Sequence, residues 1–187
     1  MEKATIGKDL EICRILNGMW QVAGGHGQID SKLAIQDMQK YQESGFTTWD
    51  LADIYGPAES LIGDFSKKVE QDVQAFTKFV PNPGPMSNSI VTYYIDESLK
   101  KMNTDCIDLL QFHWWDYQDS NYINALQHLS KLQEDGKIKN LGLTNFDTKR
   151  IKIIIEKGFK IISNQIQYSI LDQRPEKIMI PFFMKHG

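Results

Sequence analysis

The sequence predicts an α/β protein in which helices cover a parallel β-sheet. Runs of apolar and β-branched residues alternate along the chain with segments whose apolar residues recur at helical spacing. The pattern repeats about every 30 residues, the length of a strand–helix unit, and about six units are present. With 187 residues, of which 41% are hydrophobic, the chain is long enough for one core. No linker divides it, so we expect a single domain over residues 1–187.

Six buried strands are expected from the apolar runs. The runs cover residues 15–22, 46–50, 73–78, 106–112, 138–143 and 161–166. Consecutive strands that are separated by helices pair in parallel, because the helix carries the chain back to the end at which the previous strand began.

The first expected helix covers residues 31–44. Its apolar residues recur at helical spacing, and they are Leu33, Ile35, Met38 and Tyr41. Gly45 follows directly and can adopt the left-handed conformation in which many helices end.

Three further helices are expected at 87–102, 120–135 and 147–157. The first begins after the helix-breaking PNPGP, and the other two end before Gly136 and Gly158. Asp147 is the expected N-cap of the last helix, since a carboxylate can accept free backbone N–H groups of the first turn.

Two arrangements of the sheet are compatible with this pattern. A closed (β/α)8 barrel typically needs about 250 residues, so an open doubly wound sheet suits the chain length better. However, the GGHG motif at 24–27 does not match the glycine fingerprint of dinucleotide-binding open sheets, and a flexible loop is the simpler interpretation.

Composition describes an ordinary globular protein with a net charge of −3, which gives no reason to expect nucleic acid or membrane as a partner. Cys13 and Cys106 have no metal-ligand spacing, so a reduced compartment is expected. The N-terminus has no apolar run typical of a signal peptide. We therefore expect a cytoplasmic protein, or an organellar one if a transit peptide has been removed.

Four residues with acid–base chemistry are predicted at the ends of four successive strands. They are Asp50, Tyr55, Lys78 and His113. A phenol is a poor acid near neutral pH unless its anion is stabilised, and a nearby ammonium group provides that stabilisation. Asp50 can orient Lys78, and His113 can donate a hydrogen bond to a substrate oxygen. Together the four predict a site that delivers a proton to a carbonyl oxygen.

Each of the four also has a structural explanation. Tyr55 can be a packing aromatic, Lys78 a surface charge at a strand end, Asp50 a turn cap and His113 a hydrogen-bonded core residue. Their common position in the expected sheet favours the catalytic interpretation.

Longer segments carry a more specific signal. Five segments of the chain resemble, in this order, the aldo-keto reductase family. They are WDLADIYGPAESLIGDF, TKFVP, ESLKKMNTDCIDLLQFHWWD, IKNLGLTNFD and SNQIQYSILDQRPE. Asp50, Tyr55, Lys78 and His113 match the catalytic residues of that family. The resemblance implies a (β/α)8 barrel that reduces aldehydes and ketones by hydride transfer, with NADP(H) as cofactor, a small carbonyl compound as substrate and no metal.

The resemblance also implies contacts with the cofactor. Thr144 and Asn145 match the Ser-Asn pair that binds the nicotinamide carboxamide, and Gln165 matches a glutamine with the same task. Met19, in GMWQ, and Asp50 complete the expected cofactor-binding positions.

Substrate contacts are expected from four residues around the same pocket, namely Trp20, Tyr55, His113 and Trp114. Core packing is an equally good explanation for the two tryptophans.

The final segment, PEKIMIPFFMKHG, resembles the sixth helix of the family, and the last two strands have no counterpart. Six units would leave two strand edges unpaired. We therefore expect a C-terminally truncated member or fragment that binds NADPH weakly or not at all.

Two other functions stay open. A non-catalytic family member could serve as a cofactor-sensing or subunit-binding protein. Alternatively, Lys78 could form a Schiff base in a barrel aldolase, although Tyr55 and Gln165 would then have no role.

Overall fold

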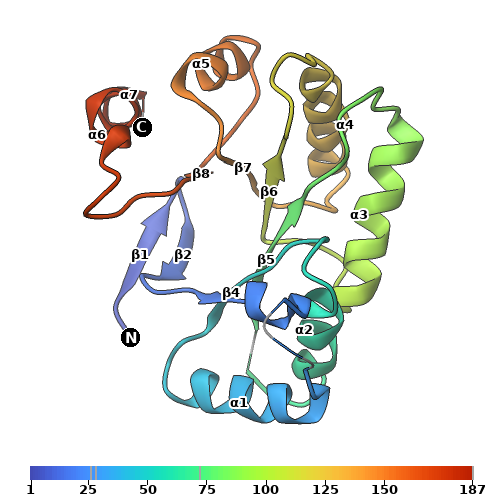
Figure 1. The fold of residues 1–187 in the computed structure, drawn as a ribbon. Coiled ribbons are helices and arrows are strands. Elements are labelled where there is room, and N and C mark those ends of the chain that lie inside the picture. Colours follow the sequence, from blue (N-terminus) through green and yellow to red (C-terminus); the bar gives the residue numbers. More distant parts are fainter. Residues whose placement is uncertain (26, 28, 72, 187) are drawn as a thin grey trace.

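The computed structural model describes residues 1–25, 27, 29–71 and 73–186. At its centre is a sheet of six parallel strands in the order β3-β4-β5-β6-β7-β8 (Figure 1). The strands are β3 (Asn17–Gly18), β4 (Thr48–Asp50), β5 (Gln74–Phe79), β6 (Leu109–His113), β7 (Leu141–Thr144) and β8 (Asn164–Gln165). The predicted parallel α/β architecture is confirmed.

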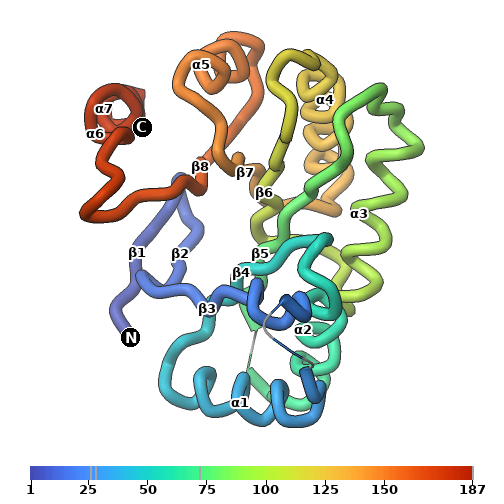
Figure 2. The backbone as a smooth tube through the Cα atoms, in the orientation of Figure 1, coloured from blue at the N-terminus to red at the C-terminus, as the bar shows by residue number. Residues whose placement is uncertain are grey.

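The strand order distinguishes the two arrangements that the sequence left open. Each strand pairs with the next one along the chain, and the order never reverses as it does in a doubly wound sheet. Helices α1 to α5 lie along one side of the strands, outside the sheet (Figure 1). Figure 2 traces the chain as it advances unit by unit around this arc. The sheet is therefore of the barrel type, with β3 and β8 at its two edges.

Seven α-helices are found in the described residues. They are α1 (Ser31–Glu43), α2 (Ala58–Ser66), α3 (Asn88–Met102), α4 (Tyr122–Glu134), α5 (Thr148–Glu156), α6 (Arg174–Lys177) and α7 (Met179–His186). The four expected helices are confirmed, and Asp147 caps α5 by accepting the Arg150 N–H at 2.8 Å. Within the described ranges, no helix has the length and apolar character needed to cross a membrane.

The expected strand at 15–22 is wrong in extent. Only Asn17–Gly18 pairs in the sheet, and the 3-10 helix η1 (Trp20–Ala23) follows at once. At Met19 the backbone leaves the extended conformation, with φ −100° and ψ 11°, while its N–H still donates to the Asp50 carbonyl at 2.9 Å. The apolar run thus continues past the strand into a turn. His26, in the GGHG motif, lies outside the described residues.

An N-terminal hairpin was not predicted. It pairs β1 (Lys3–Ile6) with β2 (Leu10–Cys13) and covers the end of the sheet at which the strands begin. There Leu10 packs on Phe76 and Leu109. Because the hairpin covers this end, the opposite end of the sheet is the one available for a site.

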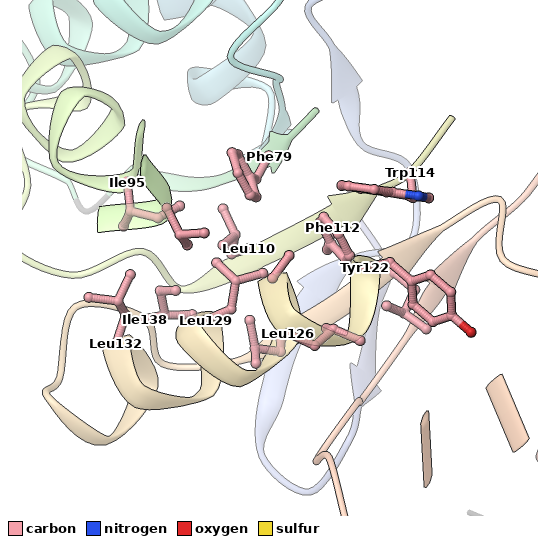
Figure 3. Close-up of a cluster of buried hydrophobic side chains, with 14 of the residues drawn as sticks. Phe79, Ile95, Leu110, Phe112, Trp114, Tyr122, Leu126, Leu129, Leu132 and Ile138 are labelled. Atoms are coloured by element: carbon pink, nitrogen blue, oxygen red, sulfur yellow. The ribbon is translucent and has the colours of Figure 1, made fainter. Parts of the chain in front are cut away.

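The largest hydrophobic cluster lies between the sheet and its outer helices. Phe79, Leu110 and Phe112 from the strands pack against Leu126 and Leu129 of α4 (Figure 3). This packing fixes the strands whose ends carry the functional residues.

The contact between α2 and α3 depends on Gly63. A Cβ atom added at this glycine would lie 2.1 Å from the Lys101 carbonyl oxygen, which belongs to the backbone and cannot move aside cheaply. We expect Gly63→Ala to lower the free energy of unfolding by about 1–3 kcal/mol through overpacking. Gly25→Ala is the matched control, since no atom of the described residues is found within 4 Å of its Cβ position. Equal urea midpoints for the two variants would contradict the close packing.

Candidate active site

The predicted catalytic residues gather at the end of the sheet opposite the hairpin. Asp50 ends β4, Lys78 is the penultimate residue of β5, and His113 ends β6. Tyr55 lies in the loop between β4 and α2. The prediction of four strand ends is therefore corrected to three strands and one loop.

A buried ion pair forms the base of this group. The Lys78 Nζ atom lies 2.7 Å from both carboxylate oxygens of Asp50 and 3.0 Å from the Leu51 carbonyl oxygen. The Lys78 side chain is only 5% exposed. Burial lowers the pKa of Lys78, and the charge of Asp50 opposes that shift. The three acceptors match the three donors of an ammonium group, so the pair is held in one orientation.

Asp50 also accepts hydrogen bonds from two glutamines. The Gln111 Nε2 atom lies 2.7 Å from one carboxylate oxygen, and the Gln165 Nε2 atom lies 3.3 Å from the other. Gln111 was missed at the sequence level. Its signal is a polar residue within LLQFH, two positions before His113 and hence on the same face of the strand.

Tyr55 lies beside the ion pair. The Lys78 Nζ atom is 5.3 Å from the centre of the Tyr55 ring, and the Trp20 ring meets Tyr55 edge-on at 5.0 Å. The pKa of Tyr55 is raised, first by burial and then by the negative charge of Asp50. In the resting site, burial and then the Asp50 charge therefore outweigh the stabilisation of the phenolate that the sequence argument expected from Lys78. Tyr55 is therefore a phenol, not a phenolate, at neutral pH.

His113 is nearly buried. Its pKa is lowered, first by burial and then by the positive charge of Lys78. A neutral imidazole carries one N–H donor and one acceptor nitrogen. His113 packs edge-on against Trp115, with ring centres 4.3 Å apart. It can therefore donate a hydrogen bond without adding a charge to the site.

The lowered pKa of His113 predicts a loss of stability in mild acid. An unfolded histidine takes up a proton near pH 6.5, whereas folded His113 does so only at lower pH. As the pH falls through 6.5 the unfolded chain binds more protons than the folded one, so the free energy of unfolding decreases. His113→Gln, which keeps an N–H donor, should reduce this decrease in urea titrations at about pH 7.5 and about pH 5.5. An identical decrease in both proteins would contradict the assignment.

The site opens into a pocket of about 440 Å³. Three of the four predicted catalytic residues, Tyr55, Lys78 and His113, line it. The remaining lining residues are Trp20, Ile54, Val80, Trp115, Thr144, Asn145, Gln165, Ile166 and Gln167. The wall combines apolar side chains with hydrogen-bonding and charged ones.

The three residues predicted to bind nicotinamide lie together in this pocket. Thr144 ends β7, Asn145 follows it, and Gln165 ends β8. The Thr144 Oγ1 atom is buried and has no hydrogen-bond partner among the described residues. Asn145 has a φ of +61°, and the Tyr117 hydroxyl donates to its carbonyl oxygen at 2.9 Å. The unpaired Thr144 hydroxyl and the side-chain amides of Asn145 and Gln165 can form hydrogen bonds with a planar carboxamide group.

Two predicted contact residues lie away from the pocket. Met19 is buried in the cluster that contains Trp49, and Trp114 is 1% exposed, with its indole N–H donating to the carbonyl of Asp116 at 2.8 Å. Trp115, which is 60% exposed, lines the pocket instead. The reason is strand alternation, since Trp115 rather than Trp114 is two positions from His113. Trp20 lies in the pocket wall.

Comparisons with known proteins identify the family of the chain. The model of the "Aldo/keto reductase family" matches residues 14–187. The chain is 24% identical over 212 residues to the NADH-specific methylglyoxal reductase of Escherichia coli (strain K12), covering 100% of this chain and 65% of that protein. It is 28% identical over 193 residues to the 6-dehydroglucose reductase of Agrobacterium fabrum, covering 91% of this chain and 63% of that protein.

A solved structure shows the same fold. The thermostable aldo-keto reductase Tm1743, crystallised with the inhibitor epalrestat, superimposes with a TM-score of 0.88 at 26% identity, covering 100% of this chain and 70% of that one. The six parallel strands thus form part of a (β/α)8 barrel. The chain belongs to the aldo/keto reductase family, and it spans somewhat less than two thirds of the length of the curated relatives described above.

Proposed function

We propose that this chain carries the proton-donating part of an NAD(P)H-dependent carbonyl reductase, which reduces an aldehyde or ketone to an alcohol. The observation that carries the proposal is the meeting of Tyr55, Lys78 and His113 in one pocket with Thr144 and Gln165. Family membership supports the reaction class.

In this proposal Tyr55 is the general acid. As negative charge develops on the carbonyl oxygen, the phenol gives its proton to that oxygen, which is a much stronger base than a phenolate. Lys78 stabilises the resulting phenolate from a distance of a few ångströms, and Asp50 keeps the lysine in place. Neutral His113 donates a hydrogen bond that orients the carbonyl group.

Thr144, Asn145 and Gln165 would hold the nicotinamide carboxamide of NADP(H). When bound, the cofactor supplies the hydride for the carbonyl carbon. Trp20 and Trp115 would form the apolar wall for the substrate, so we transfer the contact predicted for Trp114 to Trp115. We expect weak cofactor binding, because the contacts that we infer reach only the nicotinamide end.

An aldolase reaction at Lys78 is less compatible with the structure. A Schiff base requires a neutral amine that can move toward the substrate. The Lys78 nitrogen is instead surrounded by three acceptors within 3.0 Å. Borohydride trapping of a substrate adduct on Lys78 would nevertheless identify such a reaction.

Reduction of a panel of aldehydes, with NADPH or NADH in large excess, tests the proposal. We expect slow oxidation of the cofactor, matched mole for mole by alcohol formation. Absence of any alcohol from a folded protein, together with a stable partner in a pull-down, would support a non-catalytic binding protein instead.

A further inference from the structure

Asp53 connects the Tyr55 loop to the end of β5. Its backbone N–H donates to the Lys78 carbonyl oxygen at 3.0 Å, and its carboxylate accepts the Val80 N–H at 3.1 Å. These two hydrogen bonds lie on either side of Phe79. Asp53 is two residues before Tyr55, whose N–H closes a turn on the Ala52 carbonyl at 3.0 Å. The loop that carries the phenol is thus fastened to the strand that carries the lysine.

The surroundings of the Asp53 carboxyl group do not favour its charge. Its Oδ1 atom is buried and has no hydrogen-bond partner in the part of the chain that the structure describes. Burial raises the pKa of Asp53 to about 6, and the nearby Glu59 carboxylate adds to the shift. The backbone N–H groups of Val80 and Ile54 and the positive charge of Lys101 on α3 oppose the shift.

Glu59 is occupied by other partners. It lies in the first turn of α2 and is buried, and it accepts the Thr77 hydroxyl at 2.7 Å. Its second oxygen lies 3.5 Å from the Lys101 Nζ atom. Glu59 is thus bonded to a side chain of β5, whereas the Asp53 carboxylate accepts a backbone N–H from the residue that follows the strand.

We propose that Asp53 is a positioning residue for Tyr55, because its hydrogen bond to the Val80 N–H holds the loop at the distance from Lys78 that proton donation requires. Without this acceptor the loop would lose its side-chain connection to β5. The Tyr55 ring would then become more exposed to solvent and move away from the Lys78 ammonium group. The inference rests on the proposed role of Tyr55, but its test does not depend on turnover.

The test compares Asp53→Asn, which keeps an oxygen acceptor for the Val80 N–H, with Asp53→Leu, which removes it. The chain is labelled with 3-fluorotyrosine, whose lower pKa brings the titration into a milder pH range. The Tyr55 resonance is assigned by its loss in Tyr55→Phe, and exposed Tyr93 on α3 is the internal reference.

Asp53→Leu is expected to lower the pKa of Tyr55 toward the ordinary value of a tyrosine, because burial is the main cause of its raised value. Asp53→Asn should leave the Tyr55 titration close to that of the unsubstituted chain. The proposal is overturned if a folded Asp53→Leu variant leaves Tyr55 unchanged, or if both variants shift it equally.

A second measurement applies if Asp53→Leu does not fold. In the unsubstituted chain, protonation of Asp53 weakens it as an acceptor, so the Val80 amide resonance should titrate with a midpoint of about 6. The fluorotyrosine resonance of Tyr55 should follow with the same midpoint, and both changes should be absent in Asp53→Asn. A Val80 titration that Tyr55 does not follow would overturn the proposed coupling.

Discussion

Lys78→Met is expected to lower the free energy of unfolding by about 3–5 kcal/mol, because it leaves the Asp50 carboxylate buried without its cation. Methionine matches the length of the lysine stem but supplies none of its three hydrogen bonds. Urea unfolding monitored by tryptophan fluorescence measures the effect. Lys68→Met, at an exposed position on the molecule, should change the stability by less than about 0.5 kcal/mol.

The double variant Asp50→Asn/Lys78→Met isolates the cause of that loss. An asparagine at position 50 is neutral and can still accept the Gln111 side-chain amide. Most of the stability lost in Lys78→Met should therefore return. A double variant as unstable as Lys78→Met would show that lost packing, rather than the unpaired charge, is responsible.

Tyr55→Phe is expected to lower the rate of carbonyl reduction by about 10²–10⁴, the usual contribution of a general acid. The substitution removes only the hydroxyl and keeps the ring, including its edge-on contact with Trp20. Unfolding midpoints of the two proteins should therefore agree. Tyr93→Phe, on the exposed side of α3, is the matched control and should keep the original rate. Loss of activity in both variants would contradict the specific role of Tyr55.

The architecture of the sheet could be predicted because inner strands such as β5 and β6 are buried on both faces. Apolar runs such as 73–78 and 106–112 can be recognised from the local sequence alone. Helices of the chain also carry local boundary signals, such as Asp147 before α5 and Gly158 after it. The hairpin β1–β2 was missed because each of its strands is only four residues long and half exposed, so its apolar residues form no continuous run.

Local sequence could not establish the side on which each candidate residue lies. Trp114 and Trp115 are adjacent in the chain, and only the pairing of β6 determines that the first enters the core and the second the pocket. The family resemblance favoured Trp114, and alternation from His113 explains the outcome only once the fold has fixed the end of β6.

The electrostatics of the site could be predicted only in part. Residue types identified Lys78 as a partner of Asp50, and the structure confirms that pair. The direction of the Tyr55 pKa depends on burial and on its distance from Asp50, and neither quantity can be obtained from a sequence. For the same reason Asp53 and Gln111 acquire their roles only from the fold.

Transfer of deuterium most directly tests whether the Tyr55 pocket performs carbonyl reduction. The chain is incubated with excess NADPH deuterated at the transferable position and an aryl aldehyde, and the alcohol is analysed by mass spectrometry. Our account predicts an alcohol with one deuterium on the former carbonyl carbon, and a yield at least about 10²-fold lower with Tyr55→Phe. Equal yields of deuterated alcohol from the two proteins would contradict the assignment of Tyr55 as the proton donor.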